Sequence, residues 1–548
     1  MSLFVQTMLA TAGNVAGSTR GITTGEPGAP QREPWPRVHR RARAIAARLV
    51  DGGLRPGDAV AVLAGEPALV APSVQAVWLA GGSVTMLHQP TARTDLAVWA
   101  RDTVTVLRMI GSRLVLLGAE FEPLSGLLQQ HAIPFRTLSS LDGGGPLAEP
   151  VPVGEDSTAL LQLTSGSTAV PKAVRITHGN LHANMSAMAE TARLRAETDV
   201  MISWLPLFHD MGMVGFLTLP MTLGIELVKT TPVDFLRAPL LWPDLITRHG
   251  GTVTAAPNFA YALVTRRLST TDSVYDLSTL RLALNGAEPI DPRVARSFAA
   301  VGGRFGLPAD SVVCAYGMAE ATLAVSFAPP GSGLLIDDVD ADLLEAHRRA
   351  EPASRPGARS FPLLGPPLPG IEVRVVDVDG SPLGTREVGV LQLRGDSVTP
   401  GYLTVDGPVP TRDADGWLNT GDEGYVVEDG QVVVCGRVKD VIIMGGRNIY
   451  PTDIERAAST VDGVRAGNVV AVRLEAGERR ESFAVAVESR LAGDPETERG
   501  IRSQVAARVV DAVGVRPLKV VVLPPGTLPK TPSGKLRRTA TRTLIDQH

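Results

Sequence analysis

The chain has 548 residues, of which 44% are hydrophobic and 20% charged, as expected for a multidomain globular protein with a large core. Its net charge of −4 gives no global basic field, which argues against nucleic acid as a partner. The two cysteines, Cys314 and Cys435, exclude a disulfide framework and predict a reducing, cytoplasmic setting. No basic residue precedes Arg20, so we expect no signal peptide.

The first half of the chain predicts an α/β architecture. Residues 36–50 have the period of an amphipathic helix, and Val38, Ala42, Ile45 and Leu49 form its apolar face. An apolar strand is predicted at 58–63, and strands alternate with helices to about residue 325, which indicates largely buried sheets. The uncharged run 211–225 is too short to span a bilayer and is predicted to be buried in protein, so no transmembrane segment is expected.

The second half predicts smaller units. Residues 328–361 are rich in Pro, Gly and acidic residues and are expected to form an irregular insertion. Alternating strands at 371–376 and 388–393 indicate a small antiparallel β subdomain. A small α+β unit is then expected, with a helix after Pro451, strands at 467–473, 482–488 and 518–523, and a helix whose apolar face is Ile501, Val505, Val509 and Ala512. We therefore divide the chain into an N-terminal domain, 1–436, and a C-terminal lid, 437–548.

A hydroxyl-rich turn follows the predicted buried strand at 158–163. It contains Thr164, Ser165, Gly166, Ser167, Thr168 and Lys172. Convergent backbone N–H and O–H donors at such a turn suit a polyphosphate, although the pattern is not a Walker A loop. An ordinary Ser/Thr-rich surface turn is the alternative.

Lysine is scarce in this chain. Only six of the 53 basic residues are lysines, and four of them (Lys172, Lys439, Lys530 and Lys535) lie in motif-like segments. A retained lysine is expected where a compact ammonium on a flexible stem is needed. For Lys229 and Lys519, chance survival at the surface is a fair alternative.

Further loops place polar groups beside apolar strands. They are 203–211 with His209, 284–289 with Gly286, Ala287 and Glu288, 315–322 with Tyr316, Gly317 and Glu320, 417–422 with Asp422, 436–440 with Arg437, and the basic loop 528–538. These side chains suit a carboxylate site at the mouth of an apolar channel, stacking on a base, magnesium binding and ribose binding. Taken singly, each loop is more often a strand end, a turn or a solvated tail.

Together, these motifs make the chain resemble the adenylate-forming superfamily of acyl-CoA synthetases, luciferases and peptide-synthetase adenylation domains. The chain contains the motifs of this superfamily in the expected order, which is TSGST with PK, YGMAEAT, NTGD, GRVKD and PSGK. The chain is most similar to the fatty acyl-AMP ligase branch of this superfamily, and especially to mycobacterial siderophore-pathway ligases that load a carrier protein. The segments that carry this similarity are WLPLFHDMGMVG, AAPNFAY, LNGAEPI and GGRNIYPTDIE. The long separation of Glu320 and Gly365 also fits that branch, in which such an insertion is thought to hinder the rotation that completes CoA thioester formation.

The resemblance implies a role for each matching residue. Residues 164–168 and Lys172 would bind the ATP phosphates, with Thr164 and Glu320 holding Mg²⁺. Adenine would be surrounded by Gly286, Ala287, Glu288, Tyr316 and Gly317. Asp422 would bind ribose, with Arg437 nearby. Lys439 would lie near the hinge. Lys535 would reach the fatty carboxylate and the α-phosphate, and His209 would line the junction of acyl tunnel and nucleotide. The implied reaction converts a fatty acid and ATP to acyl-AMP and pyrophosphate, then transfers the acyl group to an acyl carrier protein in lipid or siderophore biosynthesis.

Two departures from the family pattern keep alternatives open. Ala169 and Ala173 stand where the phosphate loop usually has glycine, which bears on loop mobility and ATP affinity. A fatty acyl-CoA ligase and a catalytically weakened binding homologue are the alternatives to a carrier-protein ligase.

Overall fold

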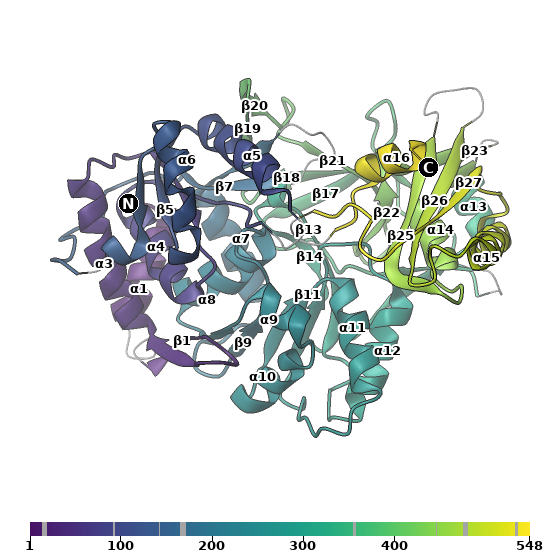
Figure 1. The fold of residues 1–548 in the computed structure, drawn as a ribbon, viewed down its shortest axis with the longest axis horizontal. Coiled ribbons are helices and arrows are strands. Elements are labelled where there is room, and N and C mark those ends of the chain that lie inside the picture. The colour runs from purple at the N-terminus through teal and green to yellow at the C-terminus, as the bar shows by residue number, and fades with distance from the viewer. Residues whose placement is uncertain are drawn as a thin grey trace. The chain divides into compact units, whose positions relative to one another are not determined.

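The computed structural model describes residues 1–13, 19–90, 94–141, 143–164, 171–354, 358–444, 447–474, 481–531 and 535–547. These residues form two compact units (Figure 1). The first contains 1–335, 364–372 and 393–418, and the second contains 336–363, 373–392 and 419–548. The predicted boundary at 436/437 falls inside the second unit and stays a prediction.

The first unit contains a mostly parallel sheet whose inner strands end on one edge. Its strands are, in spatial order, β14 (Ala324–Phe327), β13 (Val312–Gly317), β12 (Leu282–Asn285), β11 (Val253–Ala256), β9 (Val200–Ser203), β10 (Glu226–Lys229), β1 (Gly21–Thr24) and β2 (Gln31–Pro34). Only the pairs β13–β14 and β1–β2 at its two sides are antiparallel. Because parallel strands share a direction, Ser203, Lys229, Ala256 and Asn285 all lie at the carboxyl edge, where α/β proteins place ligands.

A second sheet in the same unit contains both strands that flank the predicted phosphate loop. Its order is β20 (Gly407–Pro410), β19 (Gly401–Thr404), β8 (Lys172–Thr177), β7 (Thr158–Thr164), β4 (Ser83–Met86), β3 (Ala59–Leu63), β5 (Ser112–Leu117) and β6 (Phe135–Thr137). Leu107 of α5 (Leu96–Met109) and Leu128 of α6 (Ser125–Gln130) pack on its apolar face. Strands β3 and β7 are almost wholly buried, as their apolar sequences predict.

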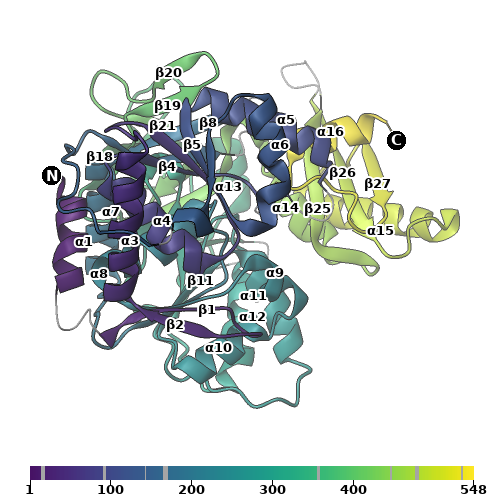
Figure 2. The same cartoon turned by 60° about the vertical axis from the view of Figure 1, so that its left-hand side comes forward.

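The predicted elements of the first half are confirmed. Helix α3 (Trp35–Asp51) buries Val38, Ala42, Ile45 and Leu49, and it packs alongside α4 (Pro67–Leu79; Figure 2). The uncharged run forms a π-helix, Met211–Thr218, followed by α8 (Leu219–Leu223), and nearly all of it is buried. In the described part of the chain, no helix has the length and apolarity needed to cross a bilayer.

The second unit holds most of a four-stranded sheet and a three-stranded sheet covered by helices. The first sheet is β17 (Ile371–Val376), β18 (Gly389–Gly395), β21 (Leu418–Val426) and β22 (Val432–Arg437). In the second, β25 (Val464–Leu474), β26 (Ser482–Ser489) and β27 (Lys519–Leu523) are covered on one face by α14 (Pro451–Ala458) and α15 (Pro495–Val513), and on the other by α16 (Arg538–Asp546). The predicted mixed α/β fold with a small β subdomain and a C-terminal α+β domain is confirmed.

One detail of the α15 prediction is wrong. Ala512 is exposed, whereas Val513 is buried with Ile501, Val505 and Val509. Ala512 and Val513 are adjacent apolar residues, and either position fits the helical period of the buried face. The sequence alone therefore did not show which of the two is buried.

The expectation of an irregular segment at 328–361 is also wrong. Strand β15 (Ile336–Val339) pairs with β16 (Arg359–Pro362), and α13 (Ala341–His347) lies between them in sequence. Asp340 caps this helix by accepting hydrogen bonds from two backbone N–H groups of its first turn. The Pro- and Gly-rich stretches on either side of these short elements account for the error, because they dominate the composition of the segment.

Candidate active site

Strands β7 and β8 bring the two ends of the predicted phosphate loop together. Thr164 ends β7, Lys172 begins β8, and the two are partners in register. The intervening Ser165, Gly166, Ser167 and Thr168, with Ala169, lie outside the described residues. The Thr164 hydroxyl is buried and has no hydrogen-bond partner among the residues the structure describes, so it is available to a bound group.

Lys172 and Glu320, which are remote in sequence, meet in one cluster with Tyr402. The Lys172 ammonium lies 3.9 Å from Glu320 Oε1 and 3.7 Å from the centroid of the Tyr402 ring. The Tyr402 hydroxyl donates to Glu320 Oε1 at 2.6 Å. Tyr402 is on β19, which pairs with the other edge of β8 so that Thr404 lies opposite Lys172. We did not predict Tyr402, because nothing local in the sequence marks a residue that reaches the site through strand pairing.

The backbone around Glu320 is held in a strained turn. Glu320 lies in a 3₁₀ turn, Ala319–Ala321, and its carbonyl accepts from Thr399 N–H at 2.7 Å. Thr322 follows with φ of 70°, which is costly for a β-branched residue, and its buried hydroxyl donates to Ser397 O at 2.7 Å. These hydrogen bonds hold the strained turn in place, and with it the backbone of Glu320.

The donor set at this cluster fits magnesium bound together with phosphates. Among the described residues, no group of three or more His, Cys, Asp or Glu side chains is arranged to hold a metal. One carboxylate, from Glu320, and one unpartnered buried hydroxyl, from Thr164, are present instead. Mg²⁺ typically uses one or two carboxylates plus phosphate oxygens and water, so this set suits it.

The predicted adenine loop lies at the carboxyl edge of the first sheet. Gly286, Ala287 and Glu288 follow β12, which pairs with the strand that carries Tyr316 and Gly317. Ala287 has φ of 67°, an uncommon conformation for alanine that marks a constrained turn.

Glu288 and Gly317 are each held by close structural contacts. The Glu288 carboxylate accepts from the backbone N–H of Phe259 at 2.6 Å, which fixes the loop to α11 (Asn258–Leu268). A Cβ atom at Gly317 would collide with the carbonyl oxygen of Leu323, so close backbone packing accounts for this glycine.

His209 lies on a loop that is tied to the second sheet. Its Nδ1 lies 2.6 Å from Asp210 Oδ1, which orients the imidazole. Gln162, on β7 two residues before Thr164, donates to the carbonyl oxygen of Phe208 at 2.9 Å. The loop that carries His209 is therefore attached to the strand that leads into the phosphate loop.

His88 is a second histidine of this region that we did not predict. Its ring packs edge-on against Phe208, with 5.3 Å between the centroids. Burial, together with the nearby charge of His209, lowers the pKa of His88 to about 4. His88 is therefore neutral at pH 7 and adds no positive charge beside His209.

In the second unit, the structure brings Asp422 and Arg437 together. They are partners on β21 and β22, and Arg437 Nε lies 2.6 Å from Asp422 Oδ1. Asp422 is buried, so the pair fixes its carboxylate. Lys439 lies in a 3₁₀ turn after β22, and Lys535 lies on a loop where its backbone N–H donates to Thr531 Oγ1 at 3.0 Å.

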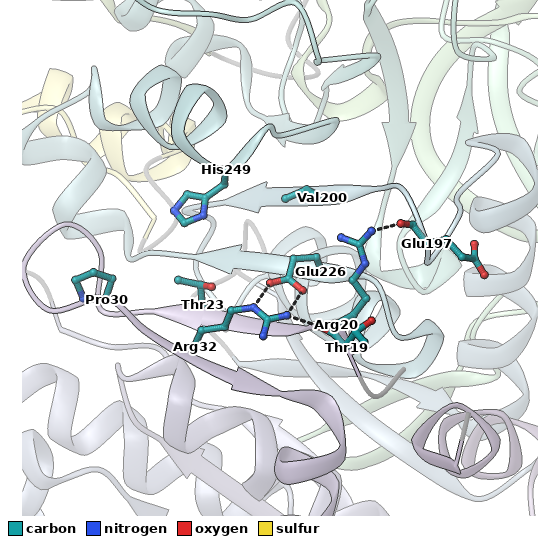
Figure 3. A pocket seen from close by; sticks show the side chains of 9 residues that line it. All are labelled: Thr19, Arg20, Thr23, Pro30, Arg32, Glu197, Val200, Glu226 and His249. Carbon is teal, nitrogen blue, oxygen red and sulfur yellow. Dashed lines mark hydrogen bonds and ion pairs between the residues drawn. The ribbon is translucent and has the colours of Figure 1, made fainter. Parts of the chain in front are cut away.

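A cavity of about 670 Å³ in the first unit has different chemistry (Figure 3). It lies near the amino ends of β1 and β10, away from their carboxyl edge. Arg32 forms a bidentate pair with Glu226, Arg20 donates to the Glu197 carbonyl, and His249 bonds to Glu26. The described residues that line this cavity include none of the predicted nucleotide-site residues, so it is not the predicted nucleotide site.

Comparisons with known proteins match family models to most of the chain. The model of the AMP-binding enzyme family matches residues 27–403, and that of the AMP-binding enzyme C-terminal domain matches 446–542. The chain is 55% identical over 547 residues to putative ligase Rv1013 of Mycobacterium tuberculosis, covering 100% of both chains. It is 34% identical over 410 residues to the long-chain-fatty-acid–AMP ligase FadD28 of the same organism, covering 70% of this chain and 69% of the relative.

The fold of the chain is also similar to that of a solved structure. A solved structure from a study of fatty acyl-adenylate ligases from E. coli and L. pneumophila superposes with a TM-score of 0.90. It is 30% identical in sequence, and the superposition covers 100% of this chain and 98% of that one.

Replacing Tyr402 with phenylalanine tests whether its hydroxyl positions Glu320. Tyr402→Phe removes the donation to the carboxylate and keeps the ring beneath Lys172. A hydrogen bond to a charged group contributes roughly 1.5–3 kcal/mol, so the Kd for ATP with Mg²⁺ should rise about tenfold or more by calorimetry. Tyr275→Phe, on a different ring pair, is the control and should leave the Kd unchanged. An unchanged Kd in Tyr402→Phe would contradict this role.

Proposed function

The chain belongs to the AMP-binding enzyme family, and we propose that it activates a fatty acid with ATP and passes the acyl group to an acyl carrier protein. The predicted superfamily and the prediction of an enzyme are thereby confirmed. The names of FadD28 and of the matching ligase structure support acyl-adenylate formation as the first step.

The reaction needs positive charge more than a protein nucleophile. The fatty carboxylate attacks the α-phosphorus of ATP, an acyl–phosphate bond forms, and pyrophosphate leaves. Both reactants are anions, so bringing them together and stabilising the charge on the phosphoryl oxygens are the main tasks. Bound magnesium would supply additional charge neutralisation at the phosphates.

The cluster of Lys172, Glu320 and Tyr402 is the observation that carries this proposal. Lys172 borders the phosphate loop, and its ammonium would pair with phosphate oxygens. Glu320 would hold Mg²⁺ with Thr164, while the Tyr402 hydroxyl fixes the carboxylate. Asp422 would bind ribose and Lys535 would reach the carboxylate and the α-phosphate. Retention of these groups argues against a non-catalytic homologue.

Contacts of the 328–361 insertion support a carrier protein over CoA as acceptor. Within the second unit, Arg359 forms an ion pair with Asp453 on α14, and its guanidinium lies 4.5 Å from the centroid of the Tyr450 ring. Glu345 on α13 accepts from Arg447 Nε at 2.8 Å. The insertion is thus bonded to the start of the C-terminal domain.

Rotation of the C-terminal domain against the insertion would break these pairs. Arg359 is 8% exposed, and removing the partner of a buried charge costs roughly 3–5 kcal/mol. A rotation that completes CoA thioester formation would therefore be disfavoured. An acceptor that needs less movement, such as a carrier-bound phosphopantetheine, fits this constraint better.

Lys535→Ala tests the adenylation step. Loss of one preorganised charge donor typically costs roughly 100- to 1,000-fold, so fatty-acid-dependent ATP–pyrophosphate exchange should fall by that factor. Lys530→Ala is the matched control on the same loop, because Lys530 donates to Asn468 at 2.9 Å, and it should retain exchange. Near-normal exchange in Lys535→Ala would remove Lys535 from the mechanism.

The choice of acceptor is tested by product analysis. Purified protein is given ATP, a ladder of fatty acids and either CoA or a holo carrier protein, and products are identified by mass spectrometry. We expect acyl-AMP alone with CoA and an acyl thioester with the carrier protein. Efficient acyl-CoA formation would instead identify a fatty acyl-CoA ligase, and absence of acyl-AMP would indicate a binding homologue.

A further inference from the structure

Lys229 is a buried lysine at the carboxyl edge of the first sheet. It ends β10, lies opposite Ser203 of β9, and is only 1% exposed, so it is not a chance survivor at the surface. No carboxylate pairs with it among the described residues. Burial alone lowers its pKa to about 7. Burying an ammonium costs free energy of folding, so Lys229 is expected to have a role other than that of a charged surface residue.

The Lys229 ammonium bonds to backbone carbonyls, one of them on the His209 loop. It donates to the carbonyl oxygen of Leu205 and, at 3.2 Å, to that of Thr230. Leu205 lies four residues before His209 on the loop that joins β9 to the π-helix. Lys229 therefore holds the first half of this loop, and Gln162 holds its second half through Phe208.

Further contacts restrain the loop that carries His209. Ser203 Oγ accepts from Leu205 N–H at 3.2 Å, and the Pro206 carbonyl accepts from His209 N–H at 3.3 Å. A Cβ atom at Gly212 would collide with the Pro206 carbonyl, so the loop returns close to the helix that follows. These hydrogen bonds restrain the backbone at Leu205 and at His209 within one short loop.

We propose that Lys229 is a positioning residue that fixes residues 204–210 from β10 and so sets the position of His209 for the acyl substrate. The inference rests on the proposed function, which places His209 at the junction of acyl group and nucleotide. A lysine suits this place because a compact ammonium offers three donors in variable directions, whereas the planar guanidinium of arginine has five in a fixed fork.

Neighbouring titratable groups have partners of their own. Asp234 on α9 (Pro232–Arg237) accepts from the Thr231 hydroxyl, Glu26 pairs with Arg248, and Glu226 at the far end of β10 pairs with Arg32. His209, on the loop itself, lies against Asp210. Deprotonation of Lys229 above pH 7 leaves an uncharged amine, whose hydrogen bonds to carbonyls are weaker than those of the ammonium.

The main test compares Lys229→Met with Lys519→Met. Lys519 also donates to a backbone carbonyl, that of Ile545 at 3.1 Å, but it lies in the C-terminal domain. At pH 6.5, Lys229→Met should raise the KM for fatty acid in pyrophosphate exchange about ten- to hundredfold and leave the KM for ATP unchanged. Lys519→Met should change neither. The wild-type KM for fatty acid should also rise between pH 6 and 8.5, and Lys229→Met should lose this dependence.

Hydrogen exchange separates this inference from the proposed function. Mass spectrometry should show faster amide exchange of a peptide covering 204–210 in Lys229→Met than in wild type or Lys519→Met. Unchanged exchange there overturns the inference, as does an unchanged KM for fatty acid in an enzyme that makes acyl-AMP. If wild type makes no acyl-AMP, the proposed function fails and the exchange data alone decide the loop-holding role. Should Lys229→Met not fold, Lys229→Gln, which keeps a donor, replaces it and should give a smaller change in the same direction.

Discussion

The contact between Lys172 and Glu320 is the interaction on which the candidate site depends. A carboxylate beside a phosphate site repels the ligand unless positive charge compensates it. Here an ammonium at 3.9 Å and a tyrosine hydroxyl at 2.6 Å lie beside one carboxylate oxygen. Strand β8 makes this possible, because it pairs with β7 on one side and with β19 on the other. Three segments more than 80 residues apart in sequence thereby contribute to one charged cluster.

Buried amides extend the same constraint into the core. On α7 (His178–Thr191), Asn184 exchanges two hydrogen bonds with the backbone of Ala324, just beyond the Glu320 turn. Asn180 donates to the carbonyl of Val398, next to Thr399, whose N–H bonds to Glu320. Because each of these buried polar groups is satisfied, the network fixes the turn rather than destabilising it. The position of Glu320 is thus set by the core as well as by its immediate partners.

Local patterns in the sequence predicted the elements but not the contacts between them. The period of α3 and the apolar runs of β3 and β7 report burial directly, so these elements were predicted correctly. The insertion at 328–361 was misread because its Pro and Gly residues surround short elements. Tyr402, Gln162, His88 and the burial of Lys229 depend on which strands become neighbours. That order is a property of the folded sheet, so nothing near these residues in sequence reveals it.

Lys229 and Arg359 are both buried cations, and they differ in a way that follows from their chemistry. Arg359 cannot lose its proton in a protein, so it must be paired, and it has Asp453 together with the faces of Tyr450 and Phe361. Among the described residues, Lys229 bonds only to carbonyl oxygens, which accept from an ammonium and also from an uncharged amine. Because its folded pKa is lowered, the cost of burying its charge is fully present below pH 7 and declines towards pH 10.5. Arg359 therefore keeps its charge near neutral pH, whereas the charge of Lys229, and with it the strength of its hydrogen bonds, changes there.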